Sequence, residues 1–176
     1  MPIAQLISPQ ALDLKKDQPG LVILDCRFAL EDPDYGQRSY AQGHIAGSCF
    51  ADLVRDLGGK VVKGVTGRHP FPEPADLIER LQTFGINADS EVVLYDDGPG
   101  AFAARAWWLL AWLGKRDGVF ILDGGLKAWH AAGLPLSLDP PSSSRGTFTG
   151  VPDNALILSA EQLQERLAQP ALTLLD

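Results

Sequence analysis

Short apolar runs alternate with segments of helical spacing along most of the chain. Runs with the aliphatic and β-branched composition of buried strands cover residues 21–24, 45–50, 92–95 and 119–122. Helical spacing of apolar residues covers 9–16, 73–84, 101–113 and 126–132. Short apolar strands separated by helices are typical of a parallel sheet that helices cover on both faces. The pattern therefore predicts an α/β fold with a central parallel sheet.

The predicted helix 101–113 is apolar around most of its circumference. It carries Trp107, Trp108 and Trp112 among leucine and alanine residues, and Arg105 stands just before the first two tryptophans. A helix that is apolar on all sides is typical of a buried position, so we expect it to pack against the sheet. We expect Arg105 to pair with a buried carboxylate, because a charge among apolar side chains needs a partner.

The end of the chain repeats its beginning. Residues 8–25 and 159–176 align without a gap and share Ser, Leu, Gln-Pro, Leu and a closing Leu-Asp. A polar, turn-rich stretch separates the repeat from the rest. We therefore expect one domain over 1–138, a linker over 139–152, and the first helix and strand of a second copy over 153–176. Such a partial copy would leave apolar surface bare, so we expect self-association through this C-terminal segment.

Composition and charge exclude several classes of partner. Lys and Arg number 15 against 22 Asp and Glu, for a formal net charge of −7. Nucleic acid and anionic membrane both require a basic face, so neither is an expected partner. The sequence holds no apolar run of about 20 residues and no signal-peptide pattern at its start, which by default favours a cytoplasmic location. Two cysteines without a CxxC pair predict no metal site, no disulfide framework and no cofactor.

The turn after the predicted strand 92–95 is the strongest candidate site. It reads Asp96-Asp97-Gly98-Pro99-Gly100-Ala101 and leads into the tryptophan helix. A glycine-bearing turn between a parallel strand and a helix can present several backbone N–H groups to an anion. A cysteine at the head of such a turn would be held as a thiolate, but this chain has Asp96 there. Asp96 and Asp97 could form a metal or acid–base pair; we favour the interpretation that they accept hydrogen bonds from the turn and helix N–H groups.

Three other residues have a structural interpretation. Cys26 follows a predicted buried strand and Cys49 lies in an apolar run, so we expect both thiols to be buried core groups. We expect His44, in Gly-His-Ile-Ala-Gly, to hold a turn through side-chain hydrogen bonds.

Motifs spread over nearly the whole predicted domain point to one family. They are Leu24-Asp25-Cys26-Arg27, Tyr40-Ala-Gln-Gly43-His44-Ile45-Ala-Gly47, Phe50-Ala-Asp52-Leu53, His69-Pro-Phe-Pro72, Val92-Val-Leu-Tyr95-Asp96, Ala104-Arg105-Ala106-Trp107-Trp108 and Asp123-Gly124-Gly125-Leu-Lys-Ala-Trp129. With these motifs the chain resembles the N-terminal half of a two-domain rhodanese-type sulfurtransferase, of the thiosulfate and 3-mercaptopyruvate sulfurtransferase family. The closing Leu174-Leu175-Asp176 resembles the first strand of that family's second domain. The resemblance implies a rhodanese-like fold.

The resemblance also implies a reaction. Members of the family move a sulfane sulfur from a small anionic donor to a cysteine thiolate, as a persulfide, and then to a thiophilic acceptor. In that family the cysteine lies in the second domain, which here would begin before and continue beyond Asp176. This chain alone is then expected to be inactive, with a second rhodanese domain as its partner. Its own turn would be a degenerate active loop made of Asp96, Asp97, Gly98 and Gly100.

The first domain of the 3-mercaptopyruvate branch also contributes to the shared cleft. It sends an aspartate from the Phe-x-Asp element and a histidine from the His-x-x-Pro element toward the donor. The matching residues are Asp52 and His69, with Arg68 beside the histidine. The resemblance implies a supporting role for them in substrate binding or proton handling. Arg68 and His69 lie in an irregular loop, 56–74, of a length that is often functional.

Two alternatives remain beside the tandem enzyme. The chain could be a stand-alone degenerate module with a binding or regulatory role, which a stop codon directly after Asp176 would favour. A phosphatase on the related fold requires Cys-x5-Arg, a spacing that Cys26 lacks and that Cys49 and Arg55 have. We disfavour this class because we expect Cys49 to be a buried core thiol.

Overall fold

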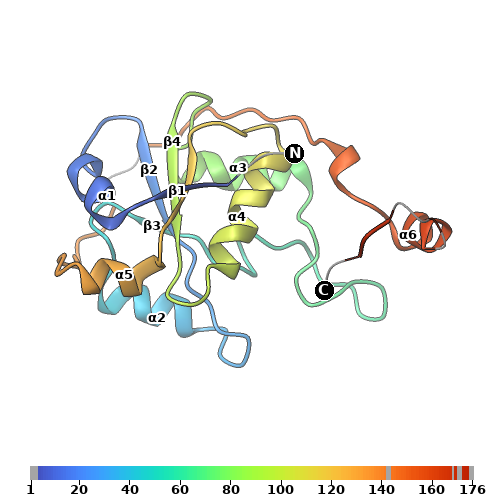
Figure 1. Cartoon of the computed structure of the whole chain (residues 1–176), viewed down its shortest axis with the longest axis horizontal. Coiled ribbons are helices and arrows are strands. Elements are labelled where there is room, and N and C mark those ends of the chain that lie inside the picture. Colours follow the sequence, from blue (N-terminus) through green and yellow to red (C-terminus); the bar gives the residue numbers. More distant parts are fainter. Residues whose placement is uncertain (1–3, 142–143, 168, 170–171, 175–176) are drawn as a thin grey trace.

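The fold is built around a parallel sheet of five strands. The computed structural model describes residues 4–141, 144–167, 169 and 172–174. The strands lie in the order β1-β5-β4-β2-β3, and every neighbouring pair is parallel. Their bounds are β1 (Gln5–Ile7), β2 (Leu21–Asp25), β3 (Cys49–Phe50), β4 (Glu91–Tyr95) and β5 (Val119–Leu122) (Figure 1).

Helices cover both faces of this sheet. One face packs against α3 (Pro74–Thr83) and α4 (Ala101–Trp112), and the other against α1 (Pro9–Lys15) and α5 (Gly125–Ala131) (Figure 1). Helix α2 (Tyr35–Gln42) contacts the edge strand β3. Side chains of β4 alternate between the two cores, with Val92 and Leu94 on one side and Val93 and Tyr95 on the other. The predicted α/β architecture with helices on both faces is confirmed.

The predicted strand 45–50 is wrong in extent. Only Cys49–Phe50 pairs with β2, because the preceding residues form a turn closed by the Ser48 N–H to the Ile45 carbonyl at 3.0 Å. Ile45 is nevertheless fully buried, and its N–H donates to the Tyr95 hydroxyl at 3.2 Å. The apolar residues before Cys49 are thus buried in a turn, and their composition was wrongly interpreted as that of a strand. The sequence pattern also missed β1 and α2.

The tryptophan helix is less deeply buried than its composition predicts. Trp112 is 4% exposed, but Trp107 and Trp108 are only partly buried. Phe71 of the long loop stacks on Trp108 with ring centroids 5.0 Å apart, and is itself 48% exposed. One side of α4 therefore takes part in an aromatic surface that the loop covers only in part.

The segment 139–152 is packed against the body along part of its length. The Gly146 N–H donates to the Gln82 carbonyl at 2.8 Å, and the Phe148 N–H to the Ile86 carbonyl at 3.0 Å. Phe148 is 3% exposed and belongs to the core between the sheet, α3 and α4. We refer to residues 145–153 as the strap. The Gln82 and Asn87 side chains add further bonds, to the Phe148 carbonyl at 2.9 Å and from the Thr147 N–H at 2.8 Å. The polar composition of the strap did not predict this attachment.

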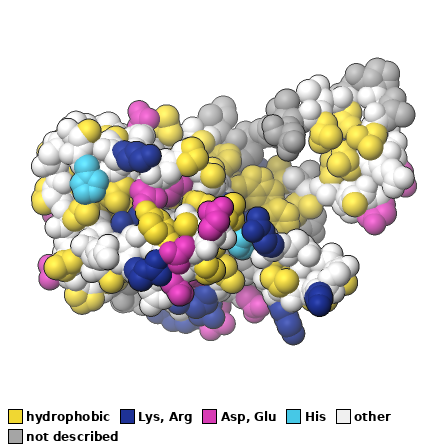
Figure 2. Space-filling view, turned by 90° about the horizontal axis from the view of Figure 1, so that it is seen from below, with side chains coloured by type: hydrophobic (Ala, Val, Ile, Leu, Met, Phe, Trp, Pro, Cys, Tyr) yellow, Lys and Arg dark blue, Asp and Glu magenta, His cyan; other side chains and the backbone are white. Residues whose placement is uncertain are grey.

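Beyond the strap the chain leaves the main body. A short 3-10 helix, η1 (Asn154–Leu156), is followed by α6 (Ala160–Arg166), which begins with a capping box between Ser159 and Gln162. No side chain of α6 is buried, and Figure 2 shows this segment standing clear of the rest. Residues 172–174 form no strand within the described part, while Leu175 and Asp176 of the predicted strand lie outside the described residues. The division into domains stays a prediction.

Candidate functional site

The carboxylate of Asp96 lies in the turn between β4 and α4. Its Oδ1 atom accepts hydrogen bonds from the backbone N–H groups of Gly98 at 3.0 Å and Gly100 at 3.1 Å. Its Oδ2 atom accepts from those of Phe102 at 3.0 Å and Ala103 at 3.1 Å. Asp96 is 1% exposed. A buried side chain therefore uses N–H groups of the turn and of the first turn of α4, which otherwise have no partner within the helix.

The turn after β5 packs against this loop. The Leu126 N–H donates to the Asp96 carbonyl at 2.9 Å. A Cβ atom on Gly125 would lie 2.4 Å from the same carbonyl oxygen, and its φ of +57° also favours glycine. Between the two turns lies a cavity of about 270 Å³, bordered by Gly98, Gly100 and Gly124. The glycines of the Asp-Gly-Gly motif thus bring the two turns into contact.

The chemistry available at this turn follows from Asp96. Sulfur transfer requires a low-pKa thiolate among N–H donors, and here a carboxylate accepts the hydrogen bonds of those donors. A carboxylate does not form a persulfide. The N–H bonding expected of Asp96 is present, whereas the same expectation for Asp97 is wrong: the Asp97 carboxylate accepts a hydrogen bond from the Tyr35 hydroxyl. That bond and burial raise the pKa of Tyr35.

A buried ion pair supports the base of the loop. Arg27 Nη2 donates to Asp25 Oδ2 at 2.6 Å and to the Gly43 carbonyl at 2.7 Å. Tyr95 directly precedes Asp96 in the chain, and its hydroxyl donates to Asp25 Oδ2 at 2.7 Å. Asp25 is fully buried and Arg27 is 5% exposed. Burial and the Asp25 carboxylate raise the pKa of Tyr95, so the phenol stays protonated and can donate.

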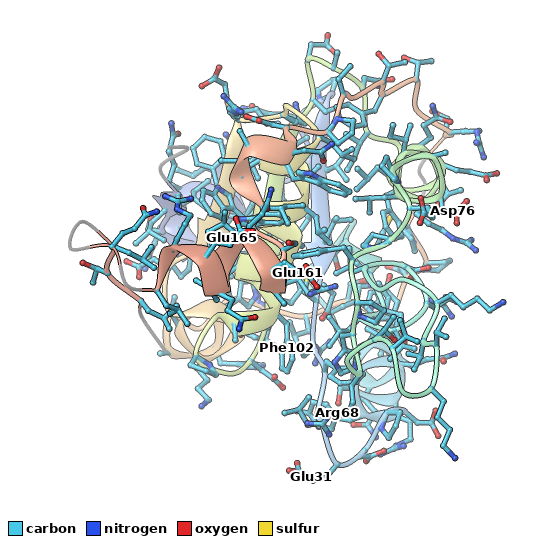
Figure 3. All side chains as sticks on the ribbon, turned by 90° about the vertical axis from the view of Figure 1, so that its right-hand side faces the viewer. Glu31, Arg68, Asp76, Phe102, Glu161 and Glu165 are labelled. Atoms are coloured by element: carbon cyan, nitrogen blue, oxygen red, sulfur yellow. The ribbon has the colours of Figure 1, made fainter. Side chains whose placement is uncertain are left out.

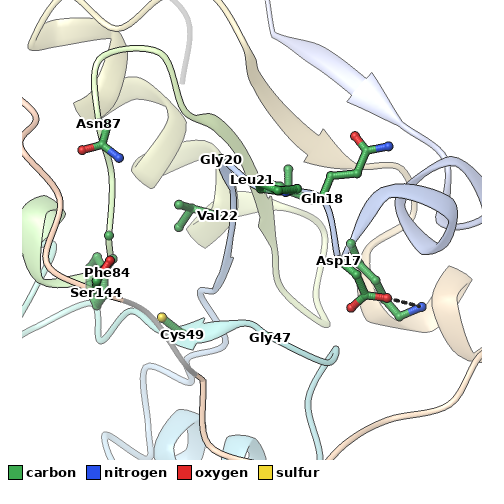
Figure 4. Close-up of a pocket in the computed structure, with 13 residues that line it drawn as sticks. Asp17, Gln18, Gly20, Leu21, Val22, Gly47, Cys49, Phe84, Asn87 and Ser144 are labelled. Carbon is green, nitrogen blue, oxygen red and sulfur yellow. Dashed lines mark ion pairs between the residues drawn. The ribbon is translucent and has the colours of Figure 1, made fainter.

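The two thiols lie within the core, as expected. Cys26 is 1% exposed, and burial together with the charges of Asp25 and Asp96 raises the pKa of its thiol well above the usual range. Cys49 is 7% exposed on β3 and borders a cavity of about 470 Å³ that extends along the first residues of β2 (Figure 4). Neither cysteine belongs to the turn of Asp96. Burial that disfavours a thiolate makes Cys26 a poor nucleophile.

His44 holds two segments together, as expected from its motif. Its Nδ1 and Nε2 atoms lie 2.9 Å from the carbonyl oxygens of Tyr40 and Asp139. The imidazole stacks on the Tyr40 ring with centroids 3.9 Å apart and is 2% exposed. Its role is to join α2 to the residues that follow α5.

Asp52 is engaged in its own turn. Its Oδ1 atom accepts hydrogen bonds from the N–H groups of Val54 and Arg55, each at 2.8 Å. Within the described part of the chain, no hydrogen bond or ion pair joins Asp52 to His69. The structure therefore does not bring these two predicted cleft residues together through a direct bond.

His69 takes part in a series of aromatic contacts with Phe28 and, through it, Phe102. Its ring meets Phe28 edge-on, with centroids 5.5 Å apart, and Phe28 in turn meets Phe102 of α4 at 5.4 Å. Arg68 is exposed and, like Phe102, lies on the side of the molecule that carries α6 (Figure 3). Burial and the charges of Arg105 and Arg68 lower the pKa of His69, so its imidazole is neutral at neutral pH. The sequence pattern missed Phe28 and Phe102, which no motif linked to His69.

Among the residues that the structure describes, no carboxylate pairs with Arg105, contrary to the expectation. Its guanidinium donates to the carbonyl oxygens of Leu57, at 3.2 and 3.0 Å, and Pro70, at 3.0 Å. It also lies over the Phe71 ring, 5.6 Å from the centroid. The expectation failed because the irregular loop supplies buried carbonyl groups that need donors just as a carboxylate would.

Within the residues that the structure describes, no three His, Cys, Asp or Glu side chains lie close enough to hold a metal ion together. Among the helices of the same residues, none is both long and apolar enough to span a bilayer.

Comparison with known proteins agrees with the fold and the motifs. The family profile of the Rhodanese-like domain matches residues 8–132. A Pseudomonas aeruginosa protein named "Probable 3-mercaptopyruvate sulfurtransferase" is 60% identical over 176 residues, which are 100% of this chain and 62% of that protein. A second relative in sequence, from Mycobacterium tuberculosis, is 41% identical over 88% of this chain and 54% of its own length. The chain thus spans a little over half to three fifths of these relatives.

Solved structures give the same picture. SseA from Escherichia coli, described as a 3-mercaptopyruvate sulfotransferase with the rhodanese fold, superimposes with a TM-score of 0.82 at 26% identity, over 95% of this chain and 63% of that one. The 3-mercaptopyruvate sulfurtransferase from Leishmania major gives a TM-score of 0.71 at 32% identity, over 83% of this chain and 40% of that one. The chain belongs to the rhodanese-like domain family.

Proposed function

We propose that this chain is the non-catalytic rhodanese-like half of a two-domain sulfurtransferase, whose persulfide-forming cysteine lies in a second domain beyond Asp176. The observation that carries the proposal is Asp96, whose carboxylate accepts four backbone hydrogen bonds where sulfur transfer needs a thiolate. The greater length of the relatives and the repeat of residues 8–25 at 159–176 support a second copy of the domain.

The proposed reaction proceeds in two displacements at sulfur. The thiolate of the second domain attacks the outer sulfur of thiosulfate or the thiol sulfur of 3-mercaptopyruvate, and a new S–S bond forms. The S–S bond of thiosulfate or the C–S bond of 3-mercaptopyruvate breaks, and sulfite or the enolate of pyruvate leaves with the electron pair. A thiophilic acceptor such as cyanide or another thiol then attacks the terminal persulfide sulfur, and the thiolate departs unchanged. No cofactor is required. In each step a sulfur atom passes to the attacking nucleophile, and the leaving group departs with the negative charge.

In this proposal the present domain completes the cleft. Arg68 is an exposed cation that can attract the donor anion, and His69 is a neutral base beside it. Phe71 stacks on Trp108 and both rings are partly exposed, so together they offer an apolar surface to the second domain. Without that domain, the same surface and the exposed α6 would favour self-association. A sedimentation or gel-filtration experiment that finds a monomer at every concentration would contradict the last point.

Activity assays of this chain test the main proposal. We expect no sulfur transfer above background from thiosulfate to cyanide, or from 3-mercaptopyruvate to a thiol. A protein extended through the second domain should be active, and loss of its own loop cysteine should abolish that activity. Turnover by the 176-residue chain at the rate of the extended protein, lost on Cys26→Ala or Cys49→Ala, would overturn the proposal.

A stand-alone binding or regulatory module is the second candidate. The strap favours it, because Phe148 closes the core and leaves residues 4–141 and 144–153 as a body with its own hydrophobic interior. A cytoplasmic location, proposed from the sequence, suits both candidates. If a coding sequence without a second rhodanese domain directs a stable, monomeric protein in cells, the module is the better description.

A further inference from the structure

Arg105 connects the two ends of the long loop to helix α4. Its side chain donates to the carbonyl oxygen of Leu57 near the start of the loop and to that of Pro70 near the end. The Gly59 N–H also donates to the Pro70 carbonyl, at 2.9 Å, which closes the base of the loop. We propose that Arg105 is a positioning residue for His69: it fastens the loop to α4 and thereby sets both the place of the imidazole and the charge that the imidazole meets.

The position of His69 follows from two constraints. On the backbone side, His69 directly precedes Pro70, whose carbonyl is bound by Arg105 at 3.0 Å. On the side-chain side, the imidazole meets the face of Phe28 at an interplanar angle of 88°. Phe71, which follows, stacks on Trp108 and lies under the Arg105 guanidinium. Loss of the Arg105 bonds would leave the backbone at 69–71 held by the Gly59 N–H and by aromatic contacts.

The charge of Arg105 is as important as its bonds. It is half-buried, and within the described residues no carboxylate pairs with it. The other elements around His69 contribute one further charge, Arg68 of the same loop, since Phe28 and Phe102 are uncharged. Two cations and burial lower the pKa of the imidazole. A neutral donor in place of Arg105 could hold the loop, but it would not lower the pKa of the His69 imidazole.

The inference deepens the proposed function and rests on it for its consequence. A neutral imidazole can accept a proton from a donor or acceptor thiol, whereas an imidazolium cannot. Arg105 would therefore keep His69 ready as a base while Arg68, exposed beside it, attracts the anion. Arg105 itself points its donors at the loop backbone and is not proposed to touch the substrate.

Proton NMR titration of the histidine ring signals tests the inference on this chain. The protein has three histidines, so His44 and His130 serve as internal references. We expect Arg105→Gln to raise the pKa of His69, because the variant removes a charge and keeps a donor. Arg105→Lys should keep the pKa low while the amide of Gly59 exchanges with solvent faster, because a single ammonium replaces the two-pronged contact.

Arg116→Gln is the matched control, since Arg116 is exposed and pairs with Asp153 at 2.5 Å on another part of the surface. It should leave the His69 titration unchanged. An unchanged His69 pKa in a folded Arg105→Gln variant would overturn the inference and leave Arg105 as a structural anchor alone. If that variant fails to fold, as judged by circular dichroism, Arg105→Lys takes its place. A folded Arg105→Lys protein in which the Gly59 amide exchanges no faster than in the parent protein contradicts the inference.

None of these measurements depends on sulfur transfer. An active 176-residue chain would overturn the proposed function and leave the link between Arg105 and His69 standing. Equally, an unaltered His69 titration would remove the link without affecting the assignment of the catalytic cysteine to another domain.

Discussion

Asp96 Oδ2 accepts a hydrogen bond from the Ala103 N–H at 3.1 Å, across seven residues of chain. This bond joins the end of β4 to the first turn of α4. Its geometry places a negative charge at the positive end of a helix whose first residues follow two glycines. The position at which a thiolate would be stabilised is therefore equally suited to stabilise a carboxylate. The loop thus provides an environment for an anion, and Asp96 supplies that anion from the chain itself.

Replacement of Asp96 should strongly destabilise the protein. Hydrogen bonds to a charged group are worth about 1.5–3 kcal/mol each, and neighbouring bonds are not additive, so we expect Asp96→Ala to lower the free energy of unfolding by about 3–5 kcal/mol. Asp96→Asn should cost less, because one acceptor oxygen remains. Urea denaturation measures both. Asp123→Ala, at an exposed site in the adjacent turn, is the control and should change stability by no more than about 0.5 kcal/mol. Equal losses at the two sites would contradict the role of Asp96.

The buried pair of Asp25 and Arg27 should behave differently from a surface pair. Arg27→Ala leaves the Asp25 carboxylate buried without its cation, at a cost of about 3–5 kcal/mol. Arg38 also pairs with an aspartate, Asp32, but both side chains are about half exposed. Arg38→Ala should therefore leave the urea midpoint almost unchanged, because solvent screens an exposed pair. Thermal and urea unfolding of the two variants compare their free energies of unfolding. A small decrease for Arg27→Ala would show that Tyr95 and water compensate for the arginine.

Periodicity sufficed for the parts of the fold where burial and local preference agree. Strands β2, β4 and β5 were predicted within one or two residues because each is a short apolar run between helices. Strand β1 was missed because it is three residues long and mostly exposed at the edge of the sheet. Helix α2 was missed because its only buried residue is Gly36, which leaves no apolar stripe to detect. Tertiary contact, and not local pattern, stabilises these two elements.

The candidate site could be predicted only where sequence neighbours form it. The turn at Asp96 is contiguous, so its N–H bonding was foreseeable from strand, glycine and helix signals alone. The partners of Tyr35 and Arg105 are remote in sequence. Asp97 lies 62 residues from Tyr35. Leu57 lies 48 residues from Arg105, and Pro70 lies 35 residues from it. One sequence carries no signal for such pairs, which depend on how the loops return to the sheet.

The strap should detach when Gly146 gains a side chain. A Cβ atom at this position would lie 2.1 Å from the Ile86 carbonyl oxygen, so Gly146→Ala forces the strap away from α3 and exposes Phe148. Exposure of a buried phenylalanine and loss of two backbone bonds should cost about 2–4 kcal/mol. Limited proteolysis should then cut the strap faster than in the parent protein. Gly67→Ala is the control, because no atom lies within 4 Å of the added methyl group and φ is outside the left-handed region. It should be neutral or slightly stabilising.

Alkaline pH should weaken the fold through its tyrosines. Burial raises the pKa of Tyr40 to about 12, and the pKa values of the other two tyrosines, Tyr35 and Tyr95, are also raised. Below about pH 10 both folded and unfolded chains keep these protons, so the stabilising contribution is complete. From pH 10 to 12 the unfolded chain loses them first, and the free energy of unfolding falls.

Tyrosinate absorbance near 295 nm measures this difference directly. At pH 10 the native protein should show far less tyrosinate than the same protein unfolded in urea. Urea midpoints should fall between pH 10 and 12, and the fall should be shallower for Tyr40→Phe, which has one raised phenol fewer. That variant also loses the bond from the Tyr40 hydroxyl to the Ser48 carbonyl at 2.6 Å, so it starts from a lower stability at pH 8. The gap between parent and variant must therefore narrow as the pH rises. A gap that stays constant would mean that Tyr40 ionises equally in both states, and its burial would then have no consequence for stability at high pH.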